Sequence, residues 1–437
     1  MKVAVIGSGA AGIGAALALS DVADVHLFER DARFGGHANT VDVDHDGARI
    51  AVDTGFIVFN HRNYPNLTAL FDWLGVETIQ SDMSFGFSLN DGALEYACDN
   101  LDTIFAQRWN ALDPRFLWVF REVLRFCRVA PADLASGAAA GASLGEWMAR
   151  RGFSAWFRDR FLLPMGGAIW STPMARMTAF PAESFLRFFQ NHDLYTGLAA
   201  AMKWRTVRGG SREYVRRAVD RLGARAHAGV GAVAVQRRDG RVRVAFDDGA
   251  EGWFDQVILA CHAPQSCALL AEKDAEEIAT LGAFSTVANR AVLHRDPRLM
   301  PRRRKVWSSW NLLSAGDRAM ARPVAVSYWM NRLQSLDPAR ELFVTLNPHV
   351  EPDPGLVFAE FAYAHPLYDA AAFAAQGAMD AIQGRGGVWH AGAWLGYGFH
   401  EDALRSGLRV ARALGAQPAW GRDWGAPLRH PDAMAAQ

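Results

Sequence analysis

The sequence is poor in the features that build disulfide frameworks, metal centres and membrane spans. Among its 437 residues the cysteines are few and scattered, without a CxxC pair or histidines at metal-ligand spacing: Cys98, Cys127, Cys261 and Cys267. We therefore expect no metal ion, no redox dithiol and a reducing compartment. No run of about 18 uninterrupted apolar residues occurs, so the sequence predicts no membrane-spanning helix.

An excess of charge of either sign is also missing. Lysine and arginine together number 46, as do aspartate and glutamate, which gives a formal net charge of +0. No polyanionic partner is implied, and we expect no binding of nucleic acid. Because an apolar strand follows Met1 almost at once, we expect no signal peptide and a cytoplasmic location. Lysine itself is nearly absent, occurring only as Lys2, Lys203, Lys273 and Lys305.

The chain does contain, at its beginning, the pattern of a dinucleotide-binding unit. An apolar run over 3–6 suits a buried parallel strand and leads into the glycine-rich stretch 7–12, which opens an alanine-rich helix. A second apolar run over 25–28 ends in Glu29, placed to accept hydrogen bonds from a ribose diol. Glycines at these spacings allow a tight turn, close approach of the backbone to a diphosphate, and close helix packing. The order strand, glycines, helix, strand and acid is typical of a Rossmann-type fold.

Several later stretches resemble the superfamily of flavin-containing amine oxidases and phytoene desaturases. Glu29 is followed shortly by the pair Gly35-Gly36, as in that superfamily. The other stretches that carry the resemblance are 52–59, 208–211, 254–260, 389–394 and 401–407. The resemblance covers nearly the whole chain, is strongest at its two ends, and implies FAD as the cofactor.

The resemblance also implies an α/β fold made of two interleaved domains. A Rossmann-type FAD-binding domain, with three layers in the order ββα, would be built from 1–89, 205–270 and 375–420. An amine-oxidase-like α+β substrate domain would be built from 90–204 and 271–374, with 421–437 as a C-terminal tail.

The residues themselves indicate what the two inserts into the FAD-binding domain, 90–204 and 271–374, contain. The first insert has aromatic residues at roughly helical spacing, which predicts helices with an aromatic core. They are Phe105, Trp109, Phe116, Trp118, Phe120 and Phe126. In the second insert, β-branched and aromatic runs over 324–329 and 342–346 predict a sheet beside the flavin.

The residues that the resemblance places against FAD come from several separate parts of the chain. They are Gly7, Gly9, Ala10, Ala11, Gly12, Glu29, Arg30, Gly35, Gly36, His37, Thr54, Gly55, Val230, Gly392, Ala393, Glu401, Asp402 and Ala403. His37 departs from the superfamily, because many relatives have an arginine after the glycine pair. The phosphate contact at that position is therefore left open.

The reacting centre is expected beside the flavin, where the substrate carbon passes a hydride to flavin N5. A dehydrogenation that forms a C=C bond also needs a base for the second hydrogen. The residues we expect there are Tyr328, His365, Phe399, His400 and Glu401. Three of them have a structural alternative: sheet core for Tyr328, a turn for His365, and favourable interaction with the helix dipole for Glu401.

Two departures argue against a standard amine oxidase. Phe399 stands where amine oxidases commonly place a tyrosine of an aromatic cage, so the face that suits a cation is less assured. Neither Lys203 nor Lys305 suits the flavin-adjacent lysine that is frequent in those enzymes, because both lie in basic, surface-like contexts.

Three stretches, 163–171, 328–334 and 396–402, resemble a narrower bacterial group of predicted flavoproteins. That group is associated with cyclopropane-synthase-like lipid methyltransferases and with modification of unsaturated fatty acyl chains, including desaturation on the way to furan fatty acids. The resemblance implies an FAD-dependent desaturase or dehydrogenase of a lipid acyl chain, with a methyltransferase as a partner.

The stretch 295–305 combines basic and apolar residues, which favours peripheral contact with an anionic inner membrane face; a solvated loop is the alternative. Two other functions stay open. One is a flavin amine oxidase, and the other is a non-redox flavoprotein that acts as an isomerase or presents lipid to a methyltransferase.

Overall fold

A five-stranded parallel sheet forms one half of the molecule in the computed structural model, which describes all residues except 171, 193, 196–201, 315–323, 426–427 and 429–437. The strand order is β19-β13-β1-β2-β9, and all four pairings are parallel. The strands are β1 (Lys2–Ile6), β2 (Asp24–Glu29), β9 (Ala226–Ala228), β13 (Gln256–Leu259) and β19 (Val388–His390). Since β2 and β13 lie on opposite sides of β1, the order reverses at β1, where such sheets form their ligand crevice.

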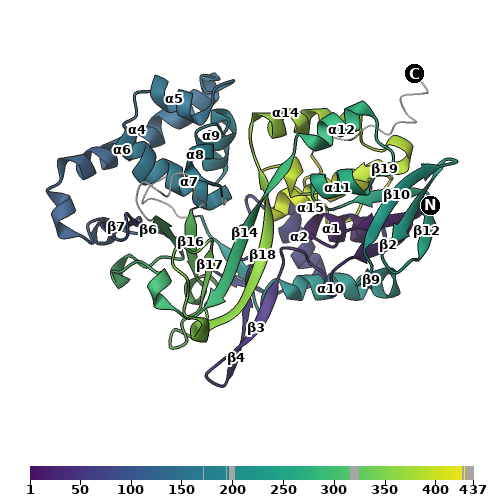
Figure 1. The fold of residues 1–437 in the computed structure, drawn as a ribbon, viewed down its shortest axis with the longest axis horizontal. Helices are drawn as coiled ribbons and strands as arrows, with labels where there is room; N and C mark the ends of the chain where they lie inside the picture. The colour runs from purple at the N-terminus through teal and green to yellow at the C-terminus, as the bar shows by residue number, and fades with distance from the viewer. Residues whose placement is uncertain (171, 193, 196–201, 315–323, 426–427, 429–437) are drawn as a thin grey trace.

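The alternation of side chains along β1 explains the three layers of this half. Val3 and Val5 point into a core shared with a layer of helices, while Ala4 and Ile6 point into a core shared with an antiparallel sheet. The helices are α1 (Ala10–Leu19), α2 (Pro65–Leu74), α10 (Arg212–Leu222) and α15 (His400–Ala413). The antiparallel strands are β10 (Ala232–Arg238), β11 (Arg241–Phe246) and β12 (Glu251–Phe254). The predicted ββα order is confirmed (Figure 1).

The other half is a seven-stranded mixed sheet in the order β18-β14-β17-β16-β15-β6-β7, in which only the β15–β6 pairing is parallel. Its strands are β6 (Phe85–Leu89), β7 (Leu94–Ala97), β14 (Ser285–His294), β15 (Trp310–Ser314), β16 (Ala325–Trp329), β17 (Phe343–Leu346) and β18 (Val357–Leu367). The predicted runs at 324–329 and 342–346 are therefore strands. One boundary is corrected, because β6 lies within 1–89 yet pairs in this second sheet through its register with β15.

A group of helices packs against this mixed sheet and buries a common aromatic core with it (Figure 1). They are α3 (Leu101–Ile104), α4 (Pro114–Ser136), α5 (Leu144–Arg150), α6 (Ala155–Phe157), α7 (Leu163–Trp170), α8 (Met174–Met177) and α9 (Ala182–Asn191). Of the predicted aromatic stripe, Phe116 and Phe126 lie in this core. Trp109 and Trp118 instead face solvent, with 59% and 51% of their surface exposed, which corrects their assignment to the core.

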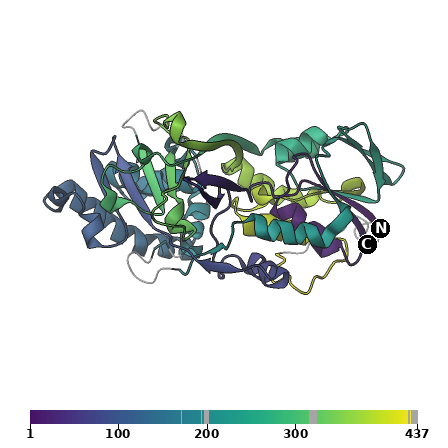
Figure 2. The same cartoon turned by 90° about the horizontal axis from the view of Figure 1, so that it is seen from below.

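Short elements connect the two halves. The ribbons are β3 (Thr40–His45) with β4 (Ala48–Asp53), and β5 (Thr78–Gln80) with β8 (Arg205–Val207). The remaining α-helices are α11 (Ala263–Leu269), α12 (Ala275–Gly282), α13 (Met330–Leu333) and α14 (Ala370–Ala378). The long pair β14–β18 runs between the halves, as both views show (Figures 1 and 2). None of the helices in the described part of the chain is long and apolar enough to cross a membrane.

One buried histidine in the parallel sheet makes a prediction about stability. His390 is 0% exposed, neither of its ring nitrogens has a hydrogen-bond partner among the described residues, and burial lowers its pKa to about 3. An unpaired buried polar group costs about 1–3 kcal/mol. We expect His390→Leu to raise the free energy of unfolding by about that much at neutral pH, measured by thermal and denaturant unfolding.

The advantage of this variant should grow on acidification. Because the folded-state pKa of His390 is lowered, the unfolded chain binds more protons below the ordinary histidine pKa of about 6.5, so the native protein loses stability as the pH falls. At about pH 5 the lowered pKa of His390 reduces the free energy of unfolding by about 2 kcal/mol, and His390→Leu removes this loss. His61→Leu, at an exposed site, is the matched control and should change neither the free energy of unfolding nor its dependence on pH. Equal pH dependence in His390→Leu and the native protein would contradict the prediction.

Candidate functional site

A cavity of about 730 Å³ begins at the carboxyl ends of the parallel strands and continues to the mixed sheet. The segments that follow β1, β2, β13 and β19 all contribute to its lining. This is the crevice at which open α/β sheets bind their ligands.

The turn between β1 and α1 brings backbone, rather than side chains, to the wall of the cavity. Gly7 has φ +104, and a Cβ atom there would lie 2.7 Å from Ala260 O. A Cβ atom at Gly12 would overlap Gly7 O, so this glycine is needed for the packing of α1 on β1. A Cβ atom at Gly9 would meet no protein atom within 4 Å, and Gly9, Ala10 and Ala11 line the cavity. With the first amides of α1 unpaired within the helix, this turn is a cradle for a diphosphate.

A carboxylate stands at the end of β2 on the same side. Glu29 Oε2 accepts hydrogen bonds from Ser8 N at 2.9 Å and Ser8 Oγ at 2.6 Å, and Oε1 accepts one from Asp31 N at 3.0 Å. Val230 N donates to Glu29 O at 2.8 Å, which brings the segment after β9 to the cavity. Glu29, Arg30 and Val230 all line this end, so the predicted ribose contact has a fixed acceptor.

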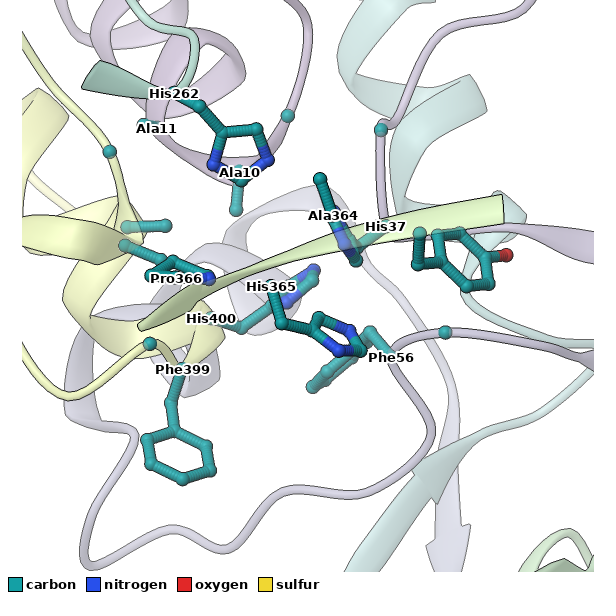
Figure 3. A pocket seen from close by; sticks show the side chains of 18 of the residues that line it. Ala10, Ala11, His37, Phe56, His262, Ala364, His365, Pro366, Phe399 and His400 are labelled. Carbon is teal, nitrogen blue, oxygen red and sulfur yellow. The ribbon is translucent and has the colours of Figure 1, made fainter. Parts of the chain in front are cut away.

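Four histidines meet in the middle of the cavity (Figure 3). The ring centroid of His37 lies 5.4 Å from that of His365 and 6.0 Å from that of His262. The Nε2 atom of His37 is buried and has no hydrogen-bond partner among the described residues. His400 stacks on Phe56, with 3.8 Å between ring centroids. A buried polar atom without a partner, in a residue on the wall of a cavity, calls for a ligand that completes the site.

All four imidazoles are neutral at physiological pH. Burial lowers the pKa of His365 to about 4 and that of His400 to about 3. It also lowers the pKa of His262, and for His37 burial is joined by repulsion from the other three histidines. Each ring therefore offers one N–H and one lone pair rather than a positive charge.

A chain of amides determines which nitrogen of His365 carries the proton. Arg290 N donates to Asn347 Oδ1, Asn347 Nδ2 donates to Asn289 Oδ1 at 2.6 Å, and Asn289 Nδ2 lies 2.9 Å from His365 Nδ1. Because an amide nitrogen can only donate, His365 Nδ1 is the acceptor and the neutral ring carries its proton on Nε2. His365 lies within β18, opposite Val287 in β14, so its interpretation as a turn residue is wrong.

His400 is held by different contacts. It is the first residue of α15, and its Nε2 lies 3.1 Å from the Tyr214 hydroxyl. Burial raises the pKa of Tyr214, so this phenol stays protonated. The nitrogen left for a ligand is His400 Nδ1.

Beyond the histidines, the cavity becomes an aromatic and aliphatic chamber in which none of the described lining residues is charged. Its walls come mainly from the mixed sheet and from α7 and α9: Met83, Phe85, Ile169, Trp170, Phe188, Leu194, Trp310, Tyr328, Leu346, Tyr368, Tyr397 and Phe399. Phe399 stacks on Phe188, and Tyr328 lies edge-on to Trp310. The charged residues among the described ones that line the cavity are Glu29, Arg30, Asp31 and Arg33, and all belong to the β2 end.

Most residues predicted to hold the cofactor line the cavity, namely Gly7, Gly9, Ala10, Ala11, Glu29, Arg30, Gly36, His37, Thr54, Gly55, Val230, Gly392, Ala393 and Ala403. Of the predicted reacting residues, Tyr328, His365, Phe399 and His400 do so as well. Gly12 and Gly35 lie behind the wall and shape it.

Glu401 and Asp402, also predicted beside the cofactor, are not among the residues that line this cavity. Glu401 accepts hydrogen bonds from Asn66 N and Leu67 N, both at 3.0 Å, and so caps the start of α2. Asp402 Oδ2 accepts from Tyr397 N at 3.0 Å. The reason is helical geometry, since His400 and Ala403 are neighbours on one face of α15 and the two acids point elsewhere.

No lysine lines the cavity, and all four lysines lie in the described part of the chain. Lys203 is exposed, and Lys305 forms an ion pair with Asp102. The sequence reasoning missed His262, Tyr363 and Asn289. His262 lies three residues after the end of β13, and this position near the carboxyl end of a strand beside β1 was a usable signal.

The family model described as flavin containing amine oxidoreductase matches residues 10–289. Among solved structures the chain is similar to putrescine oxidase bound to putrescine, with a TM-score of 0.70 and 16% identity over 95% of this chain and 99% of that one. It is similar to the CLA-producing fatty acid isomerase from P. acnes, with a TM-score of 0.66 and 17% identity over 94% and 98%. It is also similar to reduced UDP-galactopyranose mutase, with a TM-score of 0.66 and 12% identity over 94% and 93%. At these identities the likeness shows the fold. No curated protein sequence matches the chain.

Proposed function

The chain belongs to the flavin containing amine oxidoreductase family and uses FAD, and from that premise we propose that it dehydrogenates the acyl chain of a lipid. Two hydrogens would leave neighbouring carbons of an unsaturated or methylated chain, one as a hydride and one as a proton, to form a C=C bond. The observation that carries the proposal is the chamber beyond the histidines, whose described lining residues carry no charge.

The residues on the wall of the cavity fit an FAD molecule. The turn at Gly9 would receive the diphosphate, Glu29 the ribose, and the segments at Gly55 and Ala393 the flavin ring. A Cβ atom at Gly55 would overlap His37 O, so only glycine lets these two segments come together. When bound, FAD supplies the acceptor for the hydride.

The chamber suits an apolar chain better than an ammonium group. A cationic amine is usually held by a carboxylate or by an aromatic cage. Among the described residues, the carboxylates that line the cavity are Glu29 and Asp31, and both lie at the nucleotide end. Phe399 presents no hydroxyl, and no lysine is near. An acyl chain needs only apolar surface and exclusion of water, which rings such as Trp170 and Phe188 provide.

The protein's own polar groups at this point are neutral imidazoles. His365 offers Nε2–H as a hydrogen-bond donor, and His400 offers Nδ1. They can orient a ligand through hydrogen bonds, and a ring nitrogen that carries no proton can take up the one that leaves the chain, which turns the ring into an imidazolium.

The test is anaerobic mixing of the FAD-loaded protein with vesicles whose lipids carry unsaturated or methylated acyl chains. The visible absorption band of oxidised flavin should bleach, and mass spectrometry should find a lipid lighter by one pair of hydrogens. Saturated lipids are the matched control and should leave the band unchanged.

The other outcomes decide between the alternatives. Bleaching by putrescine or cyclohexylamine but by no lipid would establish an amine oxidase. A rearranged lipid of unchanged mass would establish an isomerase, and bound but unaltered lipid would establish a lipid-presenting subunit. Each of these results would overturn the proposed dehydrogenation.

A further inference from the structure

Exposed apolar side chains are concentrated on one short segment of the helical part. Six of the twelve large apolar side chains that are exposed in the described part of the chain lie between residues 101 and 124, with exposed fractions from 43% to 86%. They are Leu101, Trp109, Leu112, Leu117, Trp118 and Leu124, and we refer to them as the docking face. A concentration of this kind on a protein surface marks an interaction site.

The helix α4 presents this face because it is apolar on two sides. Phe116, Val119 and Phe126 point into the core. Leu117 and Leu124, seven residues apart, lie on the opposite side together. Burial of the first side fixes the helix on the protein, so the second side cannot turn inwards.

Arginines surround the docking face. Arg108, Arg115, Arg121 and Arg128 are all exposed, and the Arg121 guanidinium lies over the Trp118 ring, 5.3 Å from its centroid. The acids of the segment balance only part of this charge. Asp102 pairs with Arg108 and Lys305, Asp113 caps α4 and pairs with Arg115, and Glu122 is buried against Ser154. Arg121 and Arg128 are left without an acidic partner among the described residues.

The basic cluster at the end of 295–305 joins the same surface. The Arg303 guanidinium lies 5.4 Å from the centroid of Trp109, and Lys305 reaches Asp102. The basic cluster therefore borders the docking face at Trp109, although Arg303 and Arg304 also pair with Glu95 and Glu341. The helical part that carries the docking face lies at the end of the molecule opposite the parallel sheet, as both views show (Figures 1 and 2).

We propose that this surface docks the protein onto a bilayer of anionic phospholipids. Leucine and tryptophan side chains would enter the interface while arginines contact the headgroups, as amphipathic helices do at membrane surfaces. A second copy of the chain is a poorer occupant, because in a two-fold contact the arginines around the docking face would lie against the same arginines of the other copy. The proposal is independent of which reaction the cavity performs.

The test is co-sedimentation of the full-length, FAD-loaded protein with vesicles of phosphatidylglycerol and phosphatidylethanolamine, compared with vesicles of phosphatidylcholine alone. We expect at least about tenfold stronger binding to the anionic vesicles, weakened by salt. The triple variant Leu112→Ser, Leu117→Ser, Leu124→Ser should bind them at least about tenfold less. The double variant Arg121→Gln, Arg128→Gln should lose the preference for anionic lipid. Since all these side chains are exposed, the variants should keep the native melting temperature.

The matched control is Val233→Ser with Ile278→Ser, whose side chains are exposed to 54% and 52% outside the docking face, and it should bind as the native protein does. Equal binding of the triple variant and the native protein would overturn the proposal. The proposal would also be overturned if light scattering showed that the native protein is a dimer and the triple variant is not, while the native protein does not bind vesicles. A protein that binds the vesicles but leaves their lipids unchanged would overturn the proposed dehydrogenation and keep this inference.

Discussion

Replacing Gly9 by valine should give a folded protein that no longer binds FAD. Gly9 has φ −65 and ψ −180, extended backbone that valine adopts readily, and its added Cβ would meet no protein atom within 4 Å. The new side chain would instead project into the cavity at the turn that would receive the diphosphate. We expect FAD affinity to fall at least about 100-fold, a loss of about 3 kcal/mol.

The measurement is the ratio of flavin to protein after purification, with the circular dichroism spectrum and melting temperature of the apoprotein. Gly12→Val is the contrasting variant, since its Cβ would overlap Gly7 O and push α1 off β1. It should lose stability as well as flavin. If Gly9→Val keeps one FAD per chain, the diphosphate does not lie at this turn.

This site shows which features a sequence can predict. The turn at Gly9 and the acid Glu29 belong to one local unit, in which each residue constrains its neighbours within about 30 residues. A local pattern of this kind needs no knowledge of distant contacts. The order of the layers was instead implied by the family resemblance, and the alternation of side chains along β1 is its physical basis.

The rest depended on contacts that no local pattern reports. Whether His400 or Glu401 faces the cavity is a matter of about 100° of helix rotation, which is set by the packing of α15 on α1. The sequence also could not show that Trp109 and Trp118 are exposed, since helical spacing identifies a face without saying which face is buried. Asn289 became visible only when β14 and β18 were paired, because it reaches His365 across that register.

The second large effect is expected on substitution of His365, the ring at the end of the chain of amides through Asn347 and Asn289. With Nδ1 accepting from Asn289, the ring nitrogen left for a ligand is Nε2, and it carries a proton. His365 is thus predicted to act as a hydrogen-bond donor rather than as a base. Glutamine can also donate from its side-chain amide but cannot take up a proton at neutral pH.

His365→Leu should therefore lower the rate of anaerobic flavin bleaching by about 100-fold, whereas His365→Gln should keep it within about tenfold of native. FAD content should stay native in both, which separates this effect from cofactor loss. Burial lowers the pKa of His365 to about 4, so the ring is neutral at every pH above that value. We therefore expect the bleaching rate of the native protein and that of His365→Gln to depend on pH in the same way near the ordinary histidine pKa of about 6.5.

Asn289→Leu gives an independent check, because it leaves the imidazole in place and removes only the donor to Nδ1. The ring could then exchange tautomers, so the rate should fall less than in His365→Leu. If His365→Gln is as slow as His365→Leu while Asn289→Leu is fast, the ring acts as a proton acceptor. The amide chain through Asn347 would then support the strand pairing rather than the chemistry.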